Sequence, residues 1–229
     1  SSGLGRIFRG VEAWAADLSK VLHDRGENVT LFKGGGKAEA EYEQVVPCIE
    51  QGSVGIRRFR RFLPRGAWRV GLGSEVQVEQ TTFALNLIRR LRQQRIDVLH
   101  VQDAQVAVVA QWARRFGLIR TATILGHGTE ESLDFQSRIR YLQHLAPWHL
   151  EQARAAGVWR PEWTAIPNFI DTELFRPGRA DDLRAELGIP ADHLVVLTAS
   201  AIKRHHKRVD HLLSEFARLR RTRPELPVT

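Results

Sequence analysis

The sequence contains one cysteine and no methionine. A single thiol cannot form a disulfide within the chain, so a fold held together by disulfides is excluded. Cys48 lies in the apolar run 45–49 and is expected to be a buried thiol. A chain without a disulfide framework fits a reducing, cytoplasmic setting best. Because the 229 residues include no start methionine, we expect them to be an internal fragment of a longer protein.

Long apolar runs are missing as well. No stretch approaches the roughly 18 residues needed to cross a bilayer, and no basic-then-apolar secretory leader is visible. Apolar residues make up 43% of the chain and charged residues 26%, which is ordinary for a globular protein with a sizeable core. The length fits one large domain or two small ones.

Acidic residues are outnumbered by basic ones. The chain has 34 Lys and Arg against 26 Asp and Glu, a formal net charge of +8. Such an excess suits nucleic acid, an anionic membrane face or phosphorylated small molecules. Arginines on helices are more often solvated than bound to a partner. The charge therefore leaves these classes of partner open.

Helical and strand-like patterns alternate along the chain. The spacing of apolar residues and the positions of Gly and Pro predict helices over 8–22, 75–92, 104–116, 147–157 and 181–187, and a last helix from residue 209. Short apolar runs predict strands over 28–32, 45–49, 97–101, 121–125, 141–145, 163–166 and 194–198. Residues 51–73, rich in Gly and Arg, are expected to form a long exposed loop. The alternation predicts an α/β fold with a Rossmann-like parallel sheet flanked by helices.

Parallel sheets bind ligands beyond the carboxyl ends of their strands, and one candidate site precedes the first helix. Gly3 and Gly5, followed by Arg6, allow a close approach of the backbone to a ligand, and the helix N-terminus favours an anion. An ordinary turn remains the alternative. A dinucleotide-binding oxidoreductase would require a complete glycine fingerprint, and Gly10 is too far along the chain to supply its third glycine.

A second candidate is His127, which stands between Gly126 and Gly128 directly after the predicted strand 121–125. The flanking glycines leave its ring accessible at the carboxyl edge of the sheet. A histidine in a surface loop is the alternative interpretation.

The third candidate is the basic cluster 203–208, which includes Arg204 and Lys207. It follows the predicted strand 194–198 and opens a helix, so side-chain charges and helix N–H groups would converge on an anion. Nuclear-targeting and nucleic-acid-binding tracts have the same composition and remain the alternative. The adjacent His205 and His206 have no second pair of ligands nearby, so no metal site is predicted.

Residues 166–177, Ile-Pro-Asn-Phe-Ile-Asp-Thr-Glu-Leu-Phe-Arg-Pro, resemble the "PNGVDxxxFxP" segment that joins the two halves of GT-B glycosyltransferases, especially retaining family 4. Phe169 and Ile170 stand where that family usually has Gly-Val. Residues 2–6 are similar to the family's "GG-[I/L/M]-G-R" loop, with Ser2 in place of the first glycine. Residues 203–213 resemble its "G-R-x(4)-K-G" clamp followed by "VDxLL".

The resemblance implies two Rossmann-like domains facing each other across a cleft. Residues 1–170 would form the acceptor-side domain, lacking its first strand, and residues 171–229 the crossover and the beginning of the nucleotide-sugar-binding domain. The activity implied is transfer of a sugar from a nucleotide sugar to an acceptor with retention, without a cofactor or a metal. The glutamates that hold the donor sugar in the family would lie beyond Thr229, so the fragment alone is expected to be inactive.

The resemblance also assigns roles to the three candidate sites. His127 corresponds to a histidine that contacts the transferring sugar or the acceptor. Lys207 corresponds to the lysine that holds the donor diphosphate, and Arg204 is expected to replace the missing arginine. Gly3, Gly5 and Arg6 would lie in the glycine-rich loop near the substrate.

The expected partners are a nucleotide sugar and a carbohydrate or lipid-linked acceptor, with peripheral association on the inner face of the membrane. Nucleic acid is not expected under this interpretation. The alternative from another class is a basic, non-enzymatic α/β module that binds nucleic acid, with an affinity that falls steeply with salt.

Overall fold

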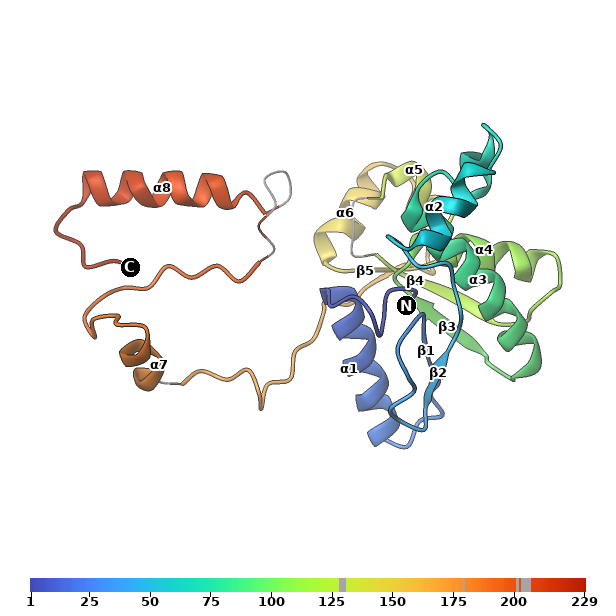
Figure 1. Ribbon diagram of the computed structural model, residues 1–229, viewed down its shortest axis with the longest axis horizontal. Helices are drawn as coiled ribbons and strands as arrows, with labels where there is room; N and C mark the ends of the chain where they lie inside the picture. Colours follow the sequence, from blue (N-terminus) through green and yellow to red (C-terminus); the bar gives the residue numbers. More distant parts are fainter. Residues whose placement is uncertain (128–130, 179, 201, 203–206) are drawn as a thin grey trace. The chain divides into compact units, whose positions relative to one another are not determined.

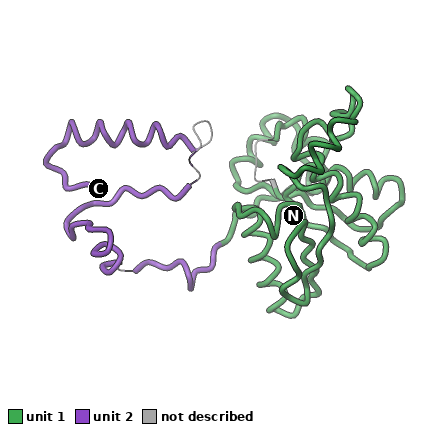
Figure 2. Tube along the Cα trace, in the orientation of Figure 1, with its two compact units in different colours: residues 1–169 green, residues 170–229 purple. Residues whose placement is uncertain are grey.

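The structure is a computed structural model that describes residues 1–127, 131–178, 180–200, 202 and 207–229. The chain divides into two compact units, Ser1–Phe169 (unit 1) and Ile170–Thr229 (unit 2), which Figure 2 shows in different colours. Among the described residues, no helix is long and apolar enough to span a membrane.

Unit 1 has parallel strands flanked by helices (Figure 1). Its helices are α1 (Gly10–Asp24), α2 (Val54–Arg61), the 3-10 helix η1 (Ala67–Val70), α3 (Glu75–Gln93), α4 (Ala104–Arg115), α5 (Leu133–Gln136) and α6 (Pro147–Ala155). Its strands are β1 (Leu31–Lys33), β2 (Glu43–Val45), β3 (Val98–Val101), β4 (Ala122–His127), β5 (Tyr141–His144) and β6 (Thr164–Ala165). This arrangement confirms the predicted α/β fold with a parallel sheet.

The strands pair in the orders β1-β2 and β3-β4-β5-β6, and every pairing is parallel. The register places Val101 beside Leu125, and His127 beside His144. The carboxyl ends of β3, β4 and β5 therefore meet at one edge of the larger sheet, where parallel sheets bind ligands.

Two clusters of buried side chains form the core of unit 1. The first packs α3 and α4 against β1 and β3, with Phe83, Leu87, Leu99 and Val106 at its centre. The second lies around Trp163, whose indole Nε1 donates to the carbonyl of Ile139 at 3.0 Å. Each such fully buried large side chain contributes about 1.5–3 kcal/mol to stability.

A groove separates the two sheets. It has a volume of about 360 Å³ and is lined by α1, β1 and β3, including Leu18, Leu31, Val98 and His100. At one end of this groove the Ser1 nitrogen donates to the carbonyl of Phe32 at 2.9 Å. Within the described residues no strand lies between β1 and β3, so the facing edges of these two strands carry no ladder.

The predicted loop over residues 51–73 is wrong, because this segment contains α2 and η1. Ser53 caps α2 by accepting a hydrogen bond from the Ile56 N–H at 3.1 Å. Ile56 and Ala67 are buried and attach the two helices to the rest of unit 1. Four of the last five residues of α2 are arginines, so the sequence there lacks a clear apolar pattern at helical spacing.

The bounds predicted for the first two strands and the first helix differ from those in the structure. Residues 28–32 and 45–49 were expected to be strands, whereas the ladder joins Leu31–Lys33 to Glu43–Val45. Lys33 is buried there because its ammonium pairs with Glu43 at 2.9 Å. Phe8, expected on the apolar face of the first helix, lies before α1 and is 98% exposed.

Unit 2 contains α7 (Asp181–Glu186) and α8 (Val209–Thr222). The predicted buried strand 194–198 is wrong: the segment makes one isolated parallel bridge, between Leu194 and Val228. Leu197 is 83% exposed. The only neighbour that the described residues provide is the segment around Val228 and Thr229, which is too short to build a ladder.

Candidate active site

Two glycine-rich segments, residues 1–6 and 34–36, interlock beyond the carboxyl end of β1. The Gly35 N–H donates to the Leu4 carbonyl at 3.1 Å, and the Gly34 N–H to the Ser1 carbonyl at 3.2 Å. A Cβ on Gly5 would lie 2.2 Å from the Gly35 oxygen, and one on Gly34 would lie 1.9 Å from the Ser2 oxygen. Gly5 also has a φ of +89°. Only glycine permits this contact, so the loop has a fixed shape next to the carboxyl edge. Gly5 and Gly36 are exposed there, whereas Gly3, Gly34 and Gly35 are buried.

Asp103 ties this glycine loop to the larger sheet. Its Oδ2 accepts from the Ser2 N–H at 2.7 Å, and its Oδ1 accepts from the Gln80 amide at 3.3 Å. Asp103 is buried and stands two residues after β3, directly before α4. The carboxylate therefore joins the loop, the end of β3 and α3 at one point.

Arg6, predicted to lie near the substrate, has its guanidinium engaged within the protein. Its Nη2 donates to the Ser2 carbonyl at 2.7 Å and lies 3.1 Å from Glu79 Oε2. Its Nε lies 3.6 Å from Glu50 Oε1. Glu79 is buried and also accepts from the Gln51 N–H at 2.7 Å. In this structure Arg6 acts as a clamp that holds the glycine loop against α3.

Cys48 lies beside the same clamp. Its Sγ donates a weak hydrogen bond to the Gly34 carbonyl at 3.6 Å. It also accepts a weak hydrogen bond from Arg6 Nη2 at 3.7 Å. Burial raises the pKa of the Cys48 thiol to about 11, although the nearby Arg6 acts in the opposite direction. The thiol is therefore protonated at neutral pH and is a poor nucleophile.

His127 is the last residue of β4 and not part of a loop that follows it, so the predicted strand was two residues too short. Gly126 lies inside the strand. A Cβ there would meet His100 Cε1 at 3.0 Å and Gln102 Cγ at 3.1 Å, so this glycine makes room for side chains of β3. The backbone of His127 pairs with that of His144 at the carboxyl edge. The His127 side chain and residues 128–130 lie outside the described part.

The room above Gly126 lets two side chains meet across β4. His100 Nε2 lies 2.8 Å from Gln143 Oε1, and the Gln143 amide donates to the Ile166 carbonyl at 3.1 Å. Because Gln143 Oε1 can only accept, the proton of the neutral imidazole is assigned to Nε2. The ring packs against Trp14 with centroids 4.9 Å apart. Burial lowers the pKa of His100, while the hydrogen bond to Gln143 raises it.

Lys207 belongs to unit 2 and is exposed. It stands one residue before Arg208, whose left-handed backbone (φ 50°, ψ 38°) begins α8. The lysine is thus placed close to a helix N-terminus, as the sequence predicted. Arg204 and its neighbours 203, 205 and 206 lie outside the described residues.

Sequence reasoning found the glycine loop and missed the groups that hold it, Asp103, Gln80 and Glu79. The sequence pointed only weakly to Asp103, as an acidic residue just after a buried strand. Within the described part of the chain, no group of three or more His, Cys, Asp and Glu residues could hold a metal ion.

Comparison with known proteins identifies the family of the chain. Residues 8–174 match the family model described as Glycosyltransferase Family 4. A segment of 95 residues is 30% identical to alpha-galactosylglucosyldiacylglycerol synthase of Streptococcus pneumoniae (strain ATCC BAA-255 / R6). That segment covers 40% of this chain and 24% of the pneumococcal protein. The family match extends over well more than half of the sequence, from before α1 to beyond β6. The chain therefore belongs to glycosyltransferase family 4.

Proposed function

We propose that the protein containing this chain is a GT-B enzyme that transfers a sugar from a nucleotide sugar to an acceptor with retention of configuration. The observation that carries the proposal is the interlocked glycine loop at the carboxyl edge, in a chain of glycosyltransferase family 4. Backbone amides held in this way can approach a phosphate or a sugar closely, because no side chain intervenes.

The roles of individual residues follow from the resemblance. The loop with Gly3 and Gly5 would face the reacting groups, and His127 would orient the sugar or the acceptor. Lys207, assisted by Arg204, would neutralise the diphosphate as it departs, the point at which charge develops in the transition state. In this proposal protein cations stabilise the leaving group, so chelation of metal ions with EDTA should leave turnover unchanged.

The test uses the protein that contains this chain and a panel of UDP-, GDP- and ADP-sugars. We expect saturable binding of one donor and a product whose anomeric proton shows retention by NMR. Lys207→Ala should lower kcat/KM by about 100-fold, as expected for loss of a group that stabilises transition-state charge. Lys20→Ala, which removes an exposed lysine of α1, is the matched control. Absence of affinity for every sugar nucleotide would refute the proposal.

The acceptor we propose is carried by a lipid in an anionic membrane. The pneumococcal relative is named for a diacylglycerol product, and this chain has a surface that suits a membrane. We call this surface, residues 54–70, the α2–η1 surface. It contains no acidic residue and six arginines: Arg57, Arg58, Arg60, Arg61, Arg65 and Arg69. Its exposed large apolar side chains are Val54, Phe62, Trp68 and Val70.

Cations next to exposed aromatic and aliphatic side chains are typical of surfaces that bind the interface of anionic bilayers. Phe62 is 80% exposed. Contact of its apolar ring with water is unfavourable in free energy, whereas contact with a lipid interface is not. The α2–η1 surface is also connected to the glycine loop, because Glu79 accepts from Gln51, near the start of α2, and pairs with Arg6. A lipid-borne acceptor would thus be close to the proposed reaction site.

Vesicle sedimentation tests the membrane proposal. We expect binding to vesicles of equimolar phosphatidylcholine and phosphatidylglycerol, and little binding to phosphatidylcholine alone. Exchanging Phe62 and Trp68 for Ser should weaken binding about tenfold or more, since each buried aromatic side chain contributes a few kcal/mol. Exchanging Trp112 and Phe116 for Ser is the control. Equal binding of both mutant pairs would contradict the assignment, and preferential binding to RNA or DNA would favour the nucleic-acid alternative.

A further inference from the structure

A second cavity lies at the opposite edge of the larger sheet, at the amino ends of β4 and β5. Its volume is about 470 Å³, within the range of small-molecule sites. It is formed between α4, from Val108 onward, and the beginnings of the two strands. Its lining residues are Val108, Gln111, Trp112, Arg114, Arg115, Thr123, Arg140 and Tyr141. None of them belongs to the candidate active site.

The lining is strongly cationic. Three guanidinium groups, of Arg114, Arg115 and Arg140, surround the cavity, and no carboxylate lines it. Arg140 Nε lies 3.6 Å from Glu162 Oε1, outside the lining. Arg114 and Arg115 form no ion pair with any described residue. Like charges gathered around one cavity repel each other, and an anion bound between them would remove that repulsion.

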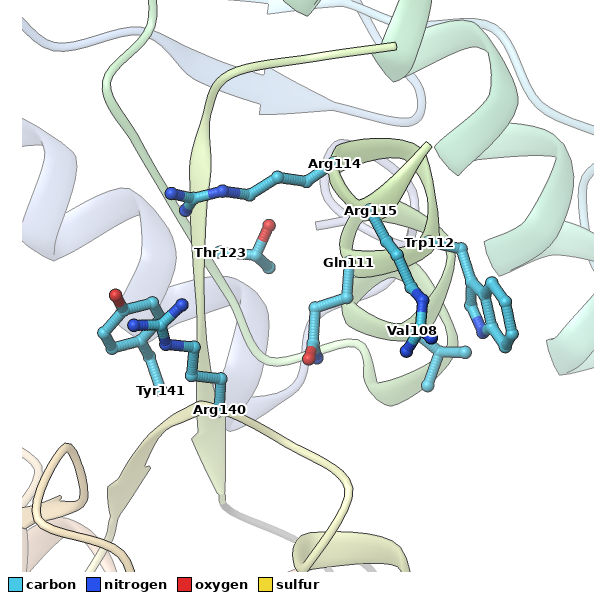
Figure 3. A pocket seen from close by; sticks show the side chains of 8 residues that line it. All are labelled: Val108, Gln111, Trp112, Arg114, Arg115, Thr123, Arg140 and Tyr141. Carbon is cyan, nitrogen blue, oxygen red and sulfur yellow. The ribbon is translucent and has the colours of Figure 1, made fainter. Parts of the chain in front are cut away.

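Thr123 gives the cavity a specific donor. The side chain is 3% exposed, and its Oγ1 is buried without a hydrogen-bond partner among the described residues. A buried hydroxyl without a partner is costly and uncommon in folded proteins. Figure 3 shows the Thr123 side chain between those of Arg114 and Arg140, which extend on either side of it. A bound acceptor oxygen would satisfy the hydroxyl and both guanidinium groups at once.

The organic part of a ligand would meet an apolar wall. Trp112 and Val108 of α4 line the same cavity, and the Arg115 guanidinium lies 5.9 Å from the centre of the Trp112 ring. The Arg140 guanidinium lies over the Tyr141 ring, 5.0 Å from the ring centre. A cation–aromatic frame of this kind holds planar groups as well as charge.

We propose that this cavity binds a phosphate monoester, with the phosphate between Arg114, Arg140 and the Thr123 hydroxyl and the organic group against Trp112 and Val108. The site is separate from the proposed transfer reaction, which uses the carboxyl edge of the sheet. Its position beside β4, whose other end carries His127, makes it suited to a regulatory ligand.

Calorimetric titration of the full protein with inorganic phosphate and with phenyl phosphate tests the site. Phenyl phosphate is expected to bind more tightly than phosphate, because its ring can pack on Trp112. Thr123→Val and Arg114→Gln should each weaken phenyl phosphate binding about tenfold or more, as expected for loss of a charge-assisted hydrogen bond. Thr123→Val should not lower the thermal stability, because the hydroxyl has no partner in the unliganded protein.

Two controls separate this site from others. Arg89→Gln removes the same charge from an exposed position of α3 and should leave the affinity unchanged. Lys207→Ala removes the proposed donor phosphate site and should also leave phenyl phosphate binding unchanged. If Lys207→Ala abolishes binding while Thr123→Val does not affect it, the cavity is not the site. A protein that transfers no sugar but shows the Thr123 dependence would leave this inference standing and refute only the proposed reaction.

Discussion

Glu79 is a carboxylate buried on α3, next to the guanidinium of Arg6 from the glycine loop. Arg6 pairs with it at 3.1 Å, and the Gln51 N–H completes its hydrogen bonds. The side chain of Arg6 is 17% exposed and that of Glu79 is 3% exposed, so solvent cannot replace either partner. Removal of one member of such a pair leaves an uncompensated buried charge.

We therefore expect Arg6→Ala to lower the free energy of unfolding by about 3 kcal/mol, and Arg6→Lys to lower it less. Urea unfolding followed by circular dichroism measures the change. Arg138→Ala is the matched control, because the Arg138–Asp134 pair is exposed on both sides and contributes only about 0.5 kcal/mol. Equal losses in the two variants would mean that the Arg6–Glu79 pair is solvated in the native protein.

His100 gives stability a dependence on pH. Burial lowers its pKa in the folded protein below the ordinary value of 6.5. As the pH falls through about 6.5, the unfolded chain takes up the proton first, so the unfolded state binds more protons and stability decreases. The free energy of unfolding falls as the pH drops from the unfolded pKa to the lower folded pKa of His100. Above pH 6.5 His100 is neutral in both states and does not change the stability.

The His100→Gln variant should lack this part of the pH dependence. Unfolding in urea at about pH 5.5 and about pH 7.5 measures it, since histidine is the side chain that titrates in this interval. We expect the wild-type protein to lose more stability on acidification than the variant does. A larger loss in the variant would show that His100 is charged in the folded state.

At the scale of elements, the glycine loop and residues 34–36 form one unit with no space for a side chain. Gly5→Ala would place a Cβ 2.2 Å from the Gly35 oxygen on a backbone with φ +89°. The left-handed backbone alone costs an ordinary residue about 1–2 kcal/mol, and the clash adds to it. We expect Gly5→Ala to lower the melting temperature by several degrees, whereas Gly10→Ala, with no atom within 4 Å of its new Cβ, should not. An unchanged melting temperature in Gly5→Ala would show that the two loops do not interlock in solution.

The elements that sequence reasoning located best carry local signals at their ends. Ser74 caps α3 by accepting from the Gln77 N–H, and Pro147 occupies the first turn of α6. Helix α2 was not predicted because Ile56 is its one buried residue, so its sequence lacks a clear apolar pattern at helical spacing. The bounds predicted for β1 were wrong because this strand ends with a lysine instead of an apolar residue. The loop glycines were visible in the sequence. Asp103, however, is 101 residues away from Ser2, and no local pattern encodes so distant a contact.

At the scale of the whole molecule, the two units differ in how much apolar surface they bury. The core clusters belong to unit 1, and Val228 is the one buried hydrophobic residue among the described residues of unit 2. Local opening requires little free energy where few apolar contacts must be broken. The two units should therefore differ in the protection of their backbone amides from hydrogen exchange.

Hydrogen exchange followed by mass spectrometry on this chain measures that difference. Peptides covering β3, β4 and β5 should exchange most slowly, because these strands lie in the core and open only on global unfolding. Peptides covering residues 194–198 should exchange rapidly, because one bridge and three backbone hydrogen bonds to residues 227–229 hold the segment. Leu197 in this segment is 83% exposed. Protection of 194–198 equal to that of β4 in this chain would contradict the exposed arrangement, because apolar side chains so exposed cannot shield the amides beside them.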